Sequence, residues 1–218
     1  MELSTKIILI RHGQSLGNLT KTFLGHTDWD LSEMGYLQAK TTAEHLKNEK
    51  IDKIYSSDLK RAYNTAKFHA DLRNLDVISN KNLREIYAGD WENKTVDQLL
   101  EIFGREVFVE QWKNNFGEFV FPNGESVKAG GDRFYNEILN ICSQNIGKTI
   151  IICAHAAVIR AFWAIVTDTP WQGVADKIPF CSNASYSILS FANGKFTALE
   201  YSNDAHLADV GITKVNLI

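Results

Sequence analysis

The stretch Ile7-Ile8-Leu9-Ile10-Arg11-His12-Gly13 has a counterpart later in the chain, Ile150-Ile151-Ile152-Cys153-Ala154-His155-Ala156-Ala157. Each begins with an apolar run that shows no polar alternation, as is typical of a strand buried on both faces within a parallel sheet. Each then reaches a histidine followed by small residues, where we expect a helix to begin. Because ligands bind beyond the carboxyl ends of such strands, we expect His12 and His155 to face one crevice.

Segments with helical periodicity lie between these strands. Ser32 is predicted to be the N-cap of a helix that extends to about Lys50, with Leu37 and Leu46 facing the core. Asp58 is predicted to cap the next helix. Strands that alternate with helices in this way indicate a layered α/β domain.

Two local signals complete the predicted fold. Thr95 and Gln98 form a capping box at the start of a further helix. Asn193-Gly194 separates two apolar segments, 185–191 and 196–201, and so predicts a tight hairpin. We therefore predict a three-layer α/β/α fold whose central sheet is mainly parallel and carries an antiparallel hairpin at one edge.

The length of 218 residues favours one domain over residues 1–218, within which the aromatic-rich segment at about 103–121 is predicted to be a lid-like insertion. A net charge of −3 argues against nucleic acid or an anionic membrane as a partner. No apolar run approaches the roughly 20 residues of a membrane span, and we expect a cytoplasmic protein. A homodimer is the base-rate expectation for a soluble enzyme.

The sequence shows no spacing typical of a disulfide framework or a metal site. Cys142, Cys153 and Cys181 are odd in number and widely spaced, and we expect buried free thiols. His-x-His and His-Glu-x-x-His patterns, which would support a metallohydrolase, do not occur. We expect neither a metal nor a cofactor.

The residue types near the two strand ends suit a phosphate group. Arg61 falls in the first turn of its predicted helix, where the helix dipole disfavours a cation unless an anion lies nearby. Guanidinium groups bind phosphate oxygens bidentately, so Arg11 and Arg61 together with His12 and His155 are candidates for a phosphate site. The alternative is that the histidines are structural and that Arg61, next to Lys60, is a solvated surface residue.

The motif Leu9-Ile10-Arg11-His12-Gly13-Gln14-Ser15-Leu16-Gly17-Asn18 resembles the signature of the histidine phosphatase superfamily, which includes cofactor-dependent phosphoglycerate mutases and many small phosphatases. Further blocks are similar to the later motifs of this family and occur in the same order: 25–35, 56–62, Leu83-Arg84-Glu85, 155–160 and Asn183-Ala184-Ser185. The resemblance covers essentially the whole chain and implies the phosphoglycerate mutase-like fold.

The resemblance also implies roles for individual residues. His12 is implied to be the nucleophile that carries a phosphoryl group, and Glu85 to be the proton donor, which requires a partly desolvated site. Arg11, Arg61 and His155 are implied to bind the phosphoryl oxygens as part of the catalytic set. The implied phosphate- or substrate-binding residues are Arg11, Gln14, Ser15, Asn18, Arg61 and Ala156.

The sequence departs from the family pattern at two places. The family commonly has Gly-Gly after the second histidine, whereas this chain has Ala156-Ala157. The mutases typically follow the acid with Arg-His-Tyr-Gly and have a threonine at the position of Leu24, whereas here Ile86 follows Glu85. A mutase needs cationic contacts to retain a carboxylated intermediate, and the segment 103–121 contains no paired arginines.

These departures favour the phosphatase branch, which includes α-ribazole phosphatases and small phosphatases of broad specificity. The predicted function is hydrolysis of a small phosphorylated metabolite through a phosphohistidine intermediate. A cofactor-dependent phosphoglycerate mutase is the alternative. A non-catalytic phosphate-binding protein is disfavoured, because His12, Arg11, Arg61, Glu85 and His155 are all present.

Overall fold

The computed structural model describes residues 3–214, so the ends of the predicted domain, 1–2 and 215–218, lie outside it. A six-stranded sheet with the order β3-β2-β4-β1-β5-β6 forms its centre. The first four strands in that order run parallel, and β5 and β6 form an antiparallel pair at the edge, as predicted. The strands are β1 (Thr5–Arg11), β2 (Lys53–Ser56), β3 (Val77–Ser79), β4 (Thr149–Ala154), β5 (Tyr186–Ala192) and β6 (Lys195–Asn203).

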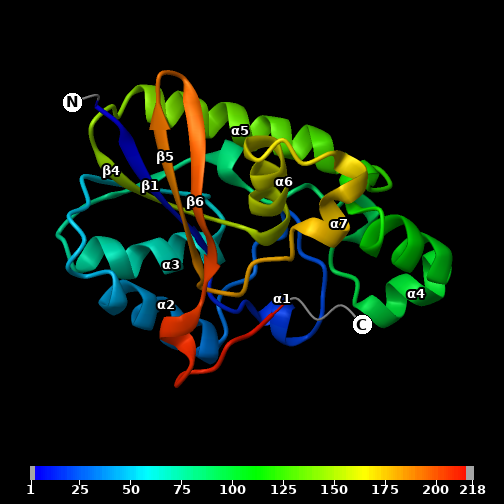
Figure 1. Cartoon of the computed structure of the whole chain (residues 1–218). Helices are drawn as coiled ribbons and strands as arrows, with labels where there is room; N and C mark the ends of the chain where they lie inside the picture. The colour runs from blue at the N-terminus through cyan, green and yellow to red at the C-terminus, as the bar shows by residue number, and fades with distance from the viewer. Residues whose placement is uncertain (1–2, 215–218) are drawn as a thin grey trace.

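Helices cover both faces of the sheet, which confirms the three-layer prediction (Figure 1). One face carries α2 (Glu33–His45) and α3 (Lys60–Asp71), and the other carries α5 (Val127–Ser143) and α6 (Ala156–Val166). The remaining α-helices are α1 (Leu16–Leu19), α4 (Val96–Arg105) and α7 (Val174–Lys177). Short 3₁₀ helices lie at 81–83, 89–91, 116–118, 171–173 and 205–207, and a π-helix spans 106–113.

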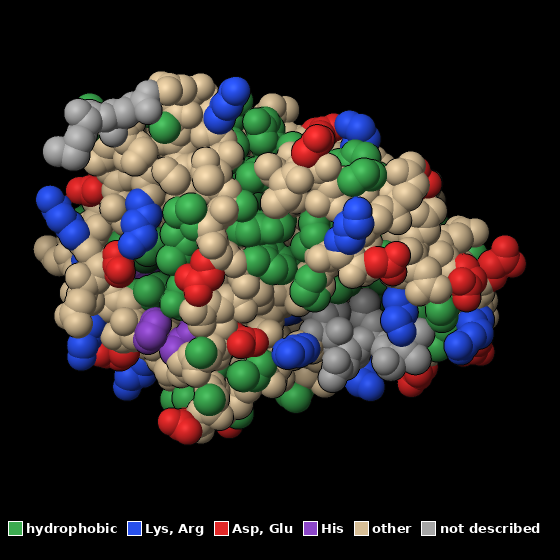
Figure 2. All heavy atoms as spheres, viewed as in Figure 1, with side chains coloured by type: hydrophobic (Ala, Val, Ile, Leu, Met, Phe, Trp, Pro, Cys, Tyr) green, Lys and Arg blue, Asp and Glu red, His purple; other side chains and the backbone are tan. Residues whose placement is uncertain are grey.

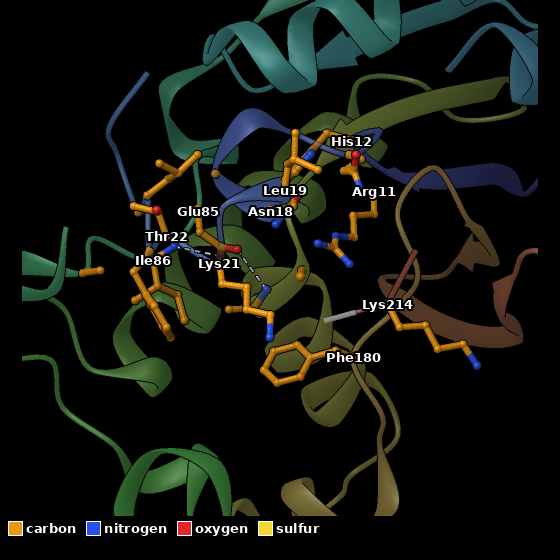
Figure 3. Close-up of a pocket in the computed structure, with 18 of the residues that line it drawn as sticks. Arg11, His12, Asn18, Leu19, Lys21, Thr22, Glu85, Ile86, Phe180 and Lys214 are labelled. Atoms are coloured by element: carbon orange, nitrogen blue, oxygen red, sulfur yellow. Dashed lines mark hydrogen bonds between the residues drawn. The ribbon is translucent and has the colours of Figure 1, made fainter. Parts of the chain in front are cut away.

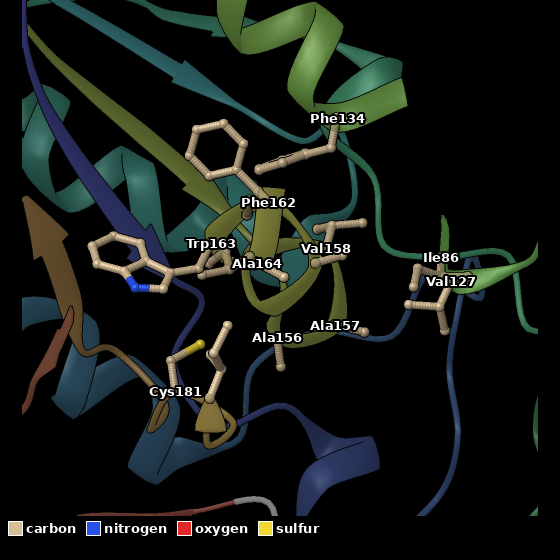
Figure 4. Packing of buried hydrophobic residues seen from close by; sticks show 14 of the residues in the cluster. Ile86, Val127, Phe134, Ala156, Ala157, Val158, Phe162, Trp163, Ala164 and Cys181 are labelled. Atoms are coloured by element: carbon tan, nitrogen blue, oxygen red, sulfur yellow. The ribbon is translucent and has the colours of Figure 1, made fainter. Parts of the chain in front are cut away.

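The central strands are apolar on both faces because each face is covered. Ile7 and Leu9 belong to the larger hydrophobic cluster, and Ile8 and Ile10 belong to the smaller one on the opposite side of the sheet. Helix α6 is buried almost all round, and Figure 4 shows its side chains packed among residues of neighbouring elements. A helix in such a position needs apolar residues on every side.

The antiparallel hairpin forms where the sequence predicted it. Asn193 and Gly194 have φ angles of 51° and 73°, the left-handed conformation that a two-residue type I′ turn requires at both positions. The capping box at Thr95 and Gln98 is also present at the start of α4. Cys142, Cys153 and Cys181 are buried free thiols, as expected.

Two details of the predicted helices were wrong. Helix α2 begins after its predicted N-cap, Ser32, but ends at His45 rather than near Lys50, and Leu37 is 49% exposed. Leu37 lies on the solvent side because the core face of α2 is formed by small and polar residues such as Ala39 and Thr42. Asp58 does not cap α3, whose N-cap residue is Leu59 and has no side-chain cap hydrogen bond.

The aromatic-rich segment 103–121 packs around Trp91, a fully buried residue. The ring of Trp91 contacts those of Phe23, Phe103, Phe108, Trp112, Phe119 and Phe121. Gly104, with φ of 80°, interrupts the helical backbone at the start of this segment and lets the chain turn back onto the core. Most aromatic side chains of the segment are therefore core residues, and its lid-like role stays a prediction.

The molecular surface is mixed in charge on the face that Figure 2 shows. Lys and Arg side chains alternate with Asp and Glu around its periphery, while hydrophobic side chains gather near its middle (Figure 2). Within residues 3–214, no helix is both long enough and apolar enough to cross a lipid bilayer.

Replacing Trp91 with alanine should lower the free energy of unfolding by about 3–5 kcal/mol, because it removes a buried ring from a close-packed cluster and leaves a cavity. Urea unfolding followed by far-UV circular dichroism measures this change. The matched surface variant is Leu199→Ala, whose parent side chain is 62% exposed and whose effect should stay within about 0.5 kcal/mol. A similarly small effect of Trp91→Ala would show that the cluster contributes little to stability.

Candidate active site

A pocket of about 240 Å³ lies beyond the carboxyl ends of β1 and β4 (Figure 3). Its position follows from the register, because Arg11 pairs with Ala154 and the next residues of the two strands are His12 and His155. The lining consists of residues 11, 12, 14, 17–19, 21–25, 85, 86, 88, 112, 121, 156, 157, 180 and 214. The pocket therefore lies at the sheet edge that the two repeated sequence patterns predicted.

His12 is held as a neutral imidazole with one free nitrogen. Its Nδ1 lies 2.6 Å from the carbonyl oxygen of Gly13, which can only accept, so Nδ1 carries the proton and donates it. Burial lowers the pKa of His12 well below its usual value, and the positive charges of Arg61 and Arg11 lower it further. Nε2 therefore keeps an unprotonated lone pair, which is what a nucleophilic imidazole requires.

His155 lies directly beside His12, with 5.2 Å between the ring centroids. The residue is fully buried, and neither of its ring nitrogens has a hydrogen-bond partner among residues 3–214. Burial, followed by the charge of Arg61, lowers the pKa of His155 well below the usual value as well. Both ring nitrogens of His69 on α3 are unpaired as well, and what distinguishes His155 is its place beside His12, a residue of the pocket lining, where a ligand atom would complete its hydrogen bonding.

Arg11 and Arg61 are each only 2% exposed. Both lie close enough to His12 for their buried positive charges to act on it. Arg11 donates from Nη1 to the carbonyl of Cys181, and its Nε has no partner in the described part of the chain. Arg61 donates to the carbonyls of Gly25 and Thr27 at 2.7 and 2.8 Å. Burial lowers the pKa of Arg61 to about 10, so it stays charged at neutral pH and retains donors for an anion.

Arg61 and His155 do not line the pocket; they are buried beside His12. Arg61 nevertheless occupies the first turn of α3, as predicted, where the positive end of the helix dipole favours a bound anion. The four predicted groups are thus brought together. Arg11 and His12 line the pocket, and Arg61 and His155 are buried beside them.

The carboxylate of Glu85 lies at the N-terminus of α6, where the first backbone N–H groups have no partner within the helix. Its carboxylate accepts hydrogen bonds from the backbone N–H groups of Ala157 and Val158, each at 3.0 Å, and from Ile86 at 2.9 Å (Figure 3). Those two amides of α6 are therefore not free for a ligand, because the protein's own carboxylate already uses them. Ala156, the first residue of α6, lines the pocket, and its N–H has no partner within the helix.

Arg133, on α5, is a residue that the sequence analysis missed. It donates to the carbonyls of Asn82, Arg84 and Glu85 and forms an ion pair with Glu125 at 2.9 Å. One guanidinium thus holds the backbone of the loop that carries the acid. Its place within a long amphipathic helix gave no signal in the sequence.

The three predicted polar residues after His12 differ in whether they line the pocket. Gln14 and Asn18 line the pocket, and their side-chain oxygens are occupied by Ser32 and by Asn183 respectively, which leaves their NH₂ groups available. Ser15 is fully buried, and its hydroxyl accepts from the N–H of Asn18 as the N-cap of α1. Ser15 does not line the pocket, so its place in the structure is that of a helix cap.

Asn183 connects the loop after His12 to the segment around Thr213. Its side-chain NH₂ donates to the carbonyl of His12 and to Asn18, and its Oδ1 accepts from the hydroxyl of Thr213. Gln38 accepts from the N–H of Gln14 and donates to Thr213. The C-terminal segment, for which the sequence analysis proposed no role, therefore supports the loop that follows His12.

No group of three or more His, Cys, Asp or Glu side chains within residues 3–214 is arranged to hold a metal ion. The polar groups at the pocket are instead cations, imidazoles and amides around one carboxylate, Glu85. This composition matches an anionic ligand such as a phosphoryl group.

Comparison with known proteins agrees with this arrangement. A model of the histidine phosphatase superfamily (branch 1) matches residues 7–204 of the chain. The chain belongs to this superfamily. Its resemblance to the family, stated above from six sequence blocks, is thereby confirmed.

Named relatives of this superfamily member include both phosphatases and mutase-like proteins. Phosphoserine phosphatase 1 of Hydrogenobacter thermophilus is 31% identical over 208 residues, which cover 94% of this chain and 95% of the relative. Phosphoglycerate mutase-like protein 4 of Arabidopsis thaliana is 30% identical over 94% of this chain and 88% of its own length. The solved structure of mycobacterial glucosyl-3-phosphoglycerate phosphatase has a TM-score of 0.83 at 25% identity and covers 91% of this chain and 99% of that one.

Replacing Arg61 with methionine should raise the pKa values of both His12 and His155. A nearby positive charge disfavours the imidazolium ion, so its removal makes protonation easier, although burial continues to hold both values down. Titration of the imidazole resonances by NMR measures the change. Arg84→Met, which removes a guanidinium paired with Asp58, is the control and should leave both titrations in place; unchanged titrations in Arg61→Met would show that burial alone sets these values.

Proposed function

We propose that this histidine phosphatase superfamily member is a phosphomonoester hydrolase that forms a phosphohistidine on His12. The observation that carries the proposal is the state of His12, whose Nδ1–H is bound to the carbonyl of Gly13 while its Nε2 stays unprotonated at the pocket. The substrate class at this level is a small phosphorylated metabolite, in keeping with a cavity of about 240 Å³, below the roughly 300–1,000 Å³ typical of drug-sized ligands.

In the first step Nε2 of His12 attacks the phosphorus atom, a P–N bond forms, and the bond between phosphorus and the ester oxygen breaks. Charge on the three remaining phosphoryl oxygens is stabilised by donors from Arg11, Arg61 and His155, which are fixed in a buried environment before the substrate arrives. The N–H of Ala156 and the side-chain NH₂ groups of Gln14 and Asn18 are further donors.

Glu85 donates a proton to the departing alcohol oxygen, which then leaves as a neutral alcohol. In the second step Glu85, now a carboxylate, accepts a proton from a water molecule as that water attacks phosphorus and releases phosphate from His12. The three amide hydrogen bonds fix the position of this carboxylate for both proton transfers.

Hydrolysis is favoured over mutase chemistry by the wall of the pocket nearest Glu85. Leu24 and Ile86 line this wall and are 8% and 1% exposed, so the pocket presents an apolar surface here, whereas the two lysines of the lining, Lys21 and Lys214, lie near Phe180. The oxygen of a released alcohol meets no cation at this wall, and water takes its place at the phosphohistidine. The aromatic walls formed by Phe23, Trp112 and Phe121 support substrates that have an apolar or ring-containing part, as α-ribazole-like or broad-specificity phosphatases would accept.

The first test follows both bond-breaking steps with an aryl phosphate, measuring acid-labile phosphate on the protein by rapid quench alongside phosphate release. Wild type should turn over without added bisphosphoglycerate, and His12→Ala should form no phosphoenzyme. Glu85→Gln should lose about 10²–10⁴-fold in rate with alkyl esters, which have poor leaving groups, and less with nitrophenyl phosphate. Glu101→Gln, a change at an exposed site on α4, is the control.

A different result would identify the alternative. If the phosphoenzyme forms but persists until a phosphoglycerate is supplied, the protein is a mutase. If no phosphoenzyme forms in wild type with any phosphomonoester, it is a phosphate-binding protein without catalytic activity.

Replacing Arg133 with methionine should lower kcat/KM by about 10–100-fold, because the loop that carries Glu85 loses the donor to its carbonyls and a small displacement of a catalytic group is costly. Steady-state assays on the folded variant, checked by thermal unfolding, measure this loss. Lys128→Met, on the same helix and in an exposed ion pair with Asp132, should retain wild-type activity. Equal activity of the two variants would show that Glu85 is positioned by the amides of α6 alone.

A further inference from the structure

Two lysines line the pocket in addition to the buried cationic groups beside His12. Lys21 lies between α1 and Phe23, and Lys214 lies on the C-terminal segment. Figure 3 shows the side chain of Lys21 extending towards Phe180, and Lys214 at the rim on the other side of Phe180 with its ammonium group directed outwards. Both are exposed, so neither belongs to the buried set around His12.

Neither lysine is neutralised by the described part of the chain. No ion pair or side-chain hydrogen bond within residues 3–214 involves Lys21 or Lys214, whereas seven other basic residues are paired. Glu85 is the single acidic residue of the lining, and its carboxylate is taken by the amides of α6. The pocket thus carries an excess of positive charge within a chain whose net charge is −3.

The backbone at the end of α1 fixes the position of Lys21. Its φ angle is 53°, in the left-handed region that non-glycine residues seldom adopt. Two contacts hold it there: its carbonyl accepts from the N–H of Val96, and the next residue, Thr22, forms a β-bridge with Thr95. This conformation is also the usual one at the end of a helix: Lys21 directly follows the C-cap of α1, and the N–H groups of Lys21 and Thr22 donate to the carbonyls of Asn18 and Gly17.

The position of Lys214 is fixed by the residue before it. Thr213 bonds to Asn183 through both its backbone carbonyl and its hydroxyl, and its hydroxyl also accepts from Gln38. Asn183 in turn binds the carbonyl of His12. The segment that brings Lys214 to the pocket rim is therefore tied to the same loop that carries the nucleophile.

We propose that Lys21 and Lys214 form a subsite for a second anionic group, a carboxylate or a second phosphate, on the alcohol part of the substrate. This inference rests on the proposed hydrolase function, since the phosphoryl group to be transferred occupies the site beside His12. Each ammonium group sits on a flexible four-carbon stem and can turn towards an anion above Phe180. The substrate class is then a small phosphomonoester with a further negative charge, rather than a neutral alcohol phosphate.

The test compares three aryl phosphates that differ only at a position insulated from the ring: 4-(carboxymethyl)phenyl, 4-(phosphonomethyl)phenyl and 4-(carbamoylmethyl)phenyl phosphate. Wild type should show a kcat/KM at least about tenfold higher for one of the two anionic compounds than for the neutral amide, equivalent to about 1.4 kcal/mol. The preferred anion identifies the group. The preference should weaken as salt is added, because exposed charges are screened.

The variants Lys21→Gln, Lys214→Gln and their combination should reduce this anion-to-amide ratio stepwise towards one. Lys195→Gln, at an exposed position of the β5–β6 hairpin, is the matched control and should keep the wild-type ratio. Equal hydrolysis of all three compounds by wild type, or an unchanged ratio in the double variant, would overturn the subsite while leaving the hydrolase in place. Failure to hydrolyse any of the three would instead remove the hydrolase, and the subsite with it.

Discussion

The parallel pairing of β1 with β4 is the constraint on which the rest of the site depends. Its register places Arg11 opposite Ala154, so His12 and His155 leave the sheet together and their rings lie 5.2 Å apart. A shift of one residue would turn every side chain of β1 to the opposite face of the sheet. Ile7–Ile10 pack against both helical layers, so the strand that positions His12 is itself part of the hydrophobic core.

The site at this edge of the sheet brings together buried arginines, imidazoles and a carboxylate, and burying any one of these charges without a partner would be costly. Burial, together with the charges of two arginines, lowers the pKa values of both imidazoles and keeps them neutral, while the half-buried carboxylate of Glu85 is held by backbone amides rather than by a guanidinium. This arrangement is important because an arginine paired directly with Glu85 would hold, in an ion pair, the carboxylate oxygens that have to take up and release a proton. Arg133 supports the acid from outside, through backbone carbonyls, without touching its carboxylate.

Much of the fold and the inner site was predictable from the sequence, since each depends on local patterns. Apolar strands, the capping box at Thr95 and the Asn193-Gly194 turn all reflect short-range chemistry, and the structure contains each of them. Leu37 was misplaced because the core face of α2 is formed by small and polar residues. Asp58 was misjudged because its partner, Arg84, lies 26 residues away, where capping rules do not reach. The contributions of Arg133, Thr213 and Lys214 likewise depend on contacts between distant segments.

Trp112 has a consequence for spectroscopy. It is 3% exposed, lies in the wall of the pocket and packs against Phe116 and Phe121, while Trp91, its close neighbour, is wholly buried. Indole emission depends on the polarity and charge near the ring, so a dianion entering the pocket changes the surroundings of one tryptophan among five. The fluorescence of Trp112 should therefore change when a ligand binds, so that binding can be measured without a label and separately from turnover.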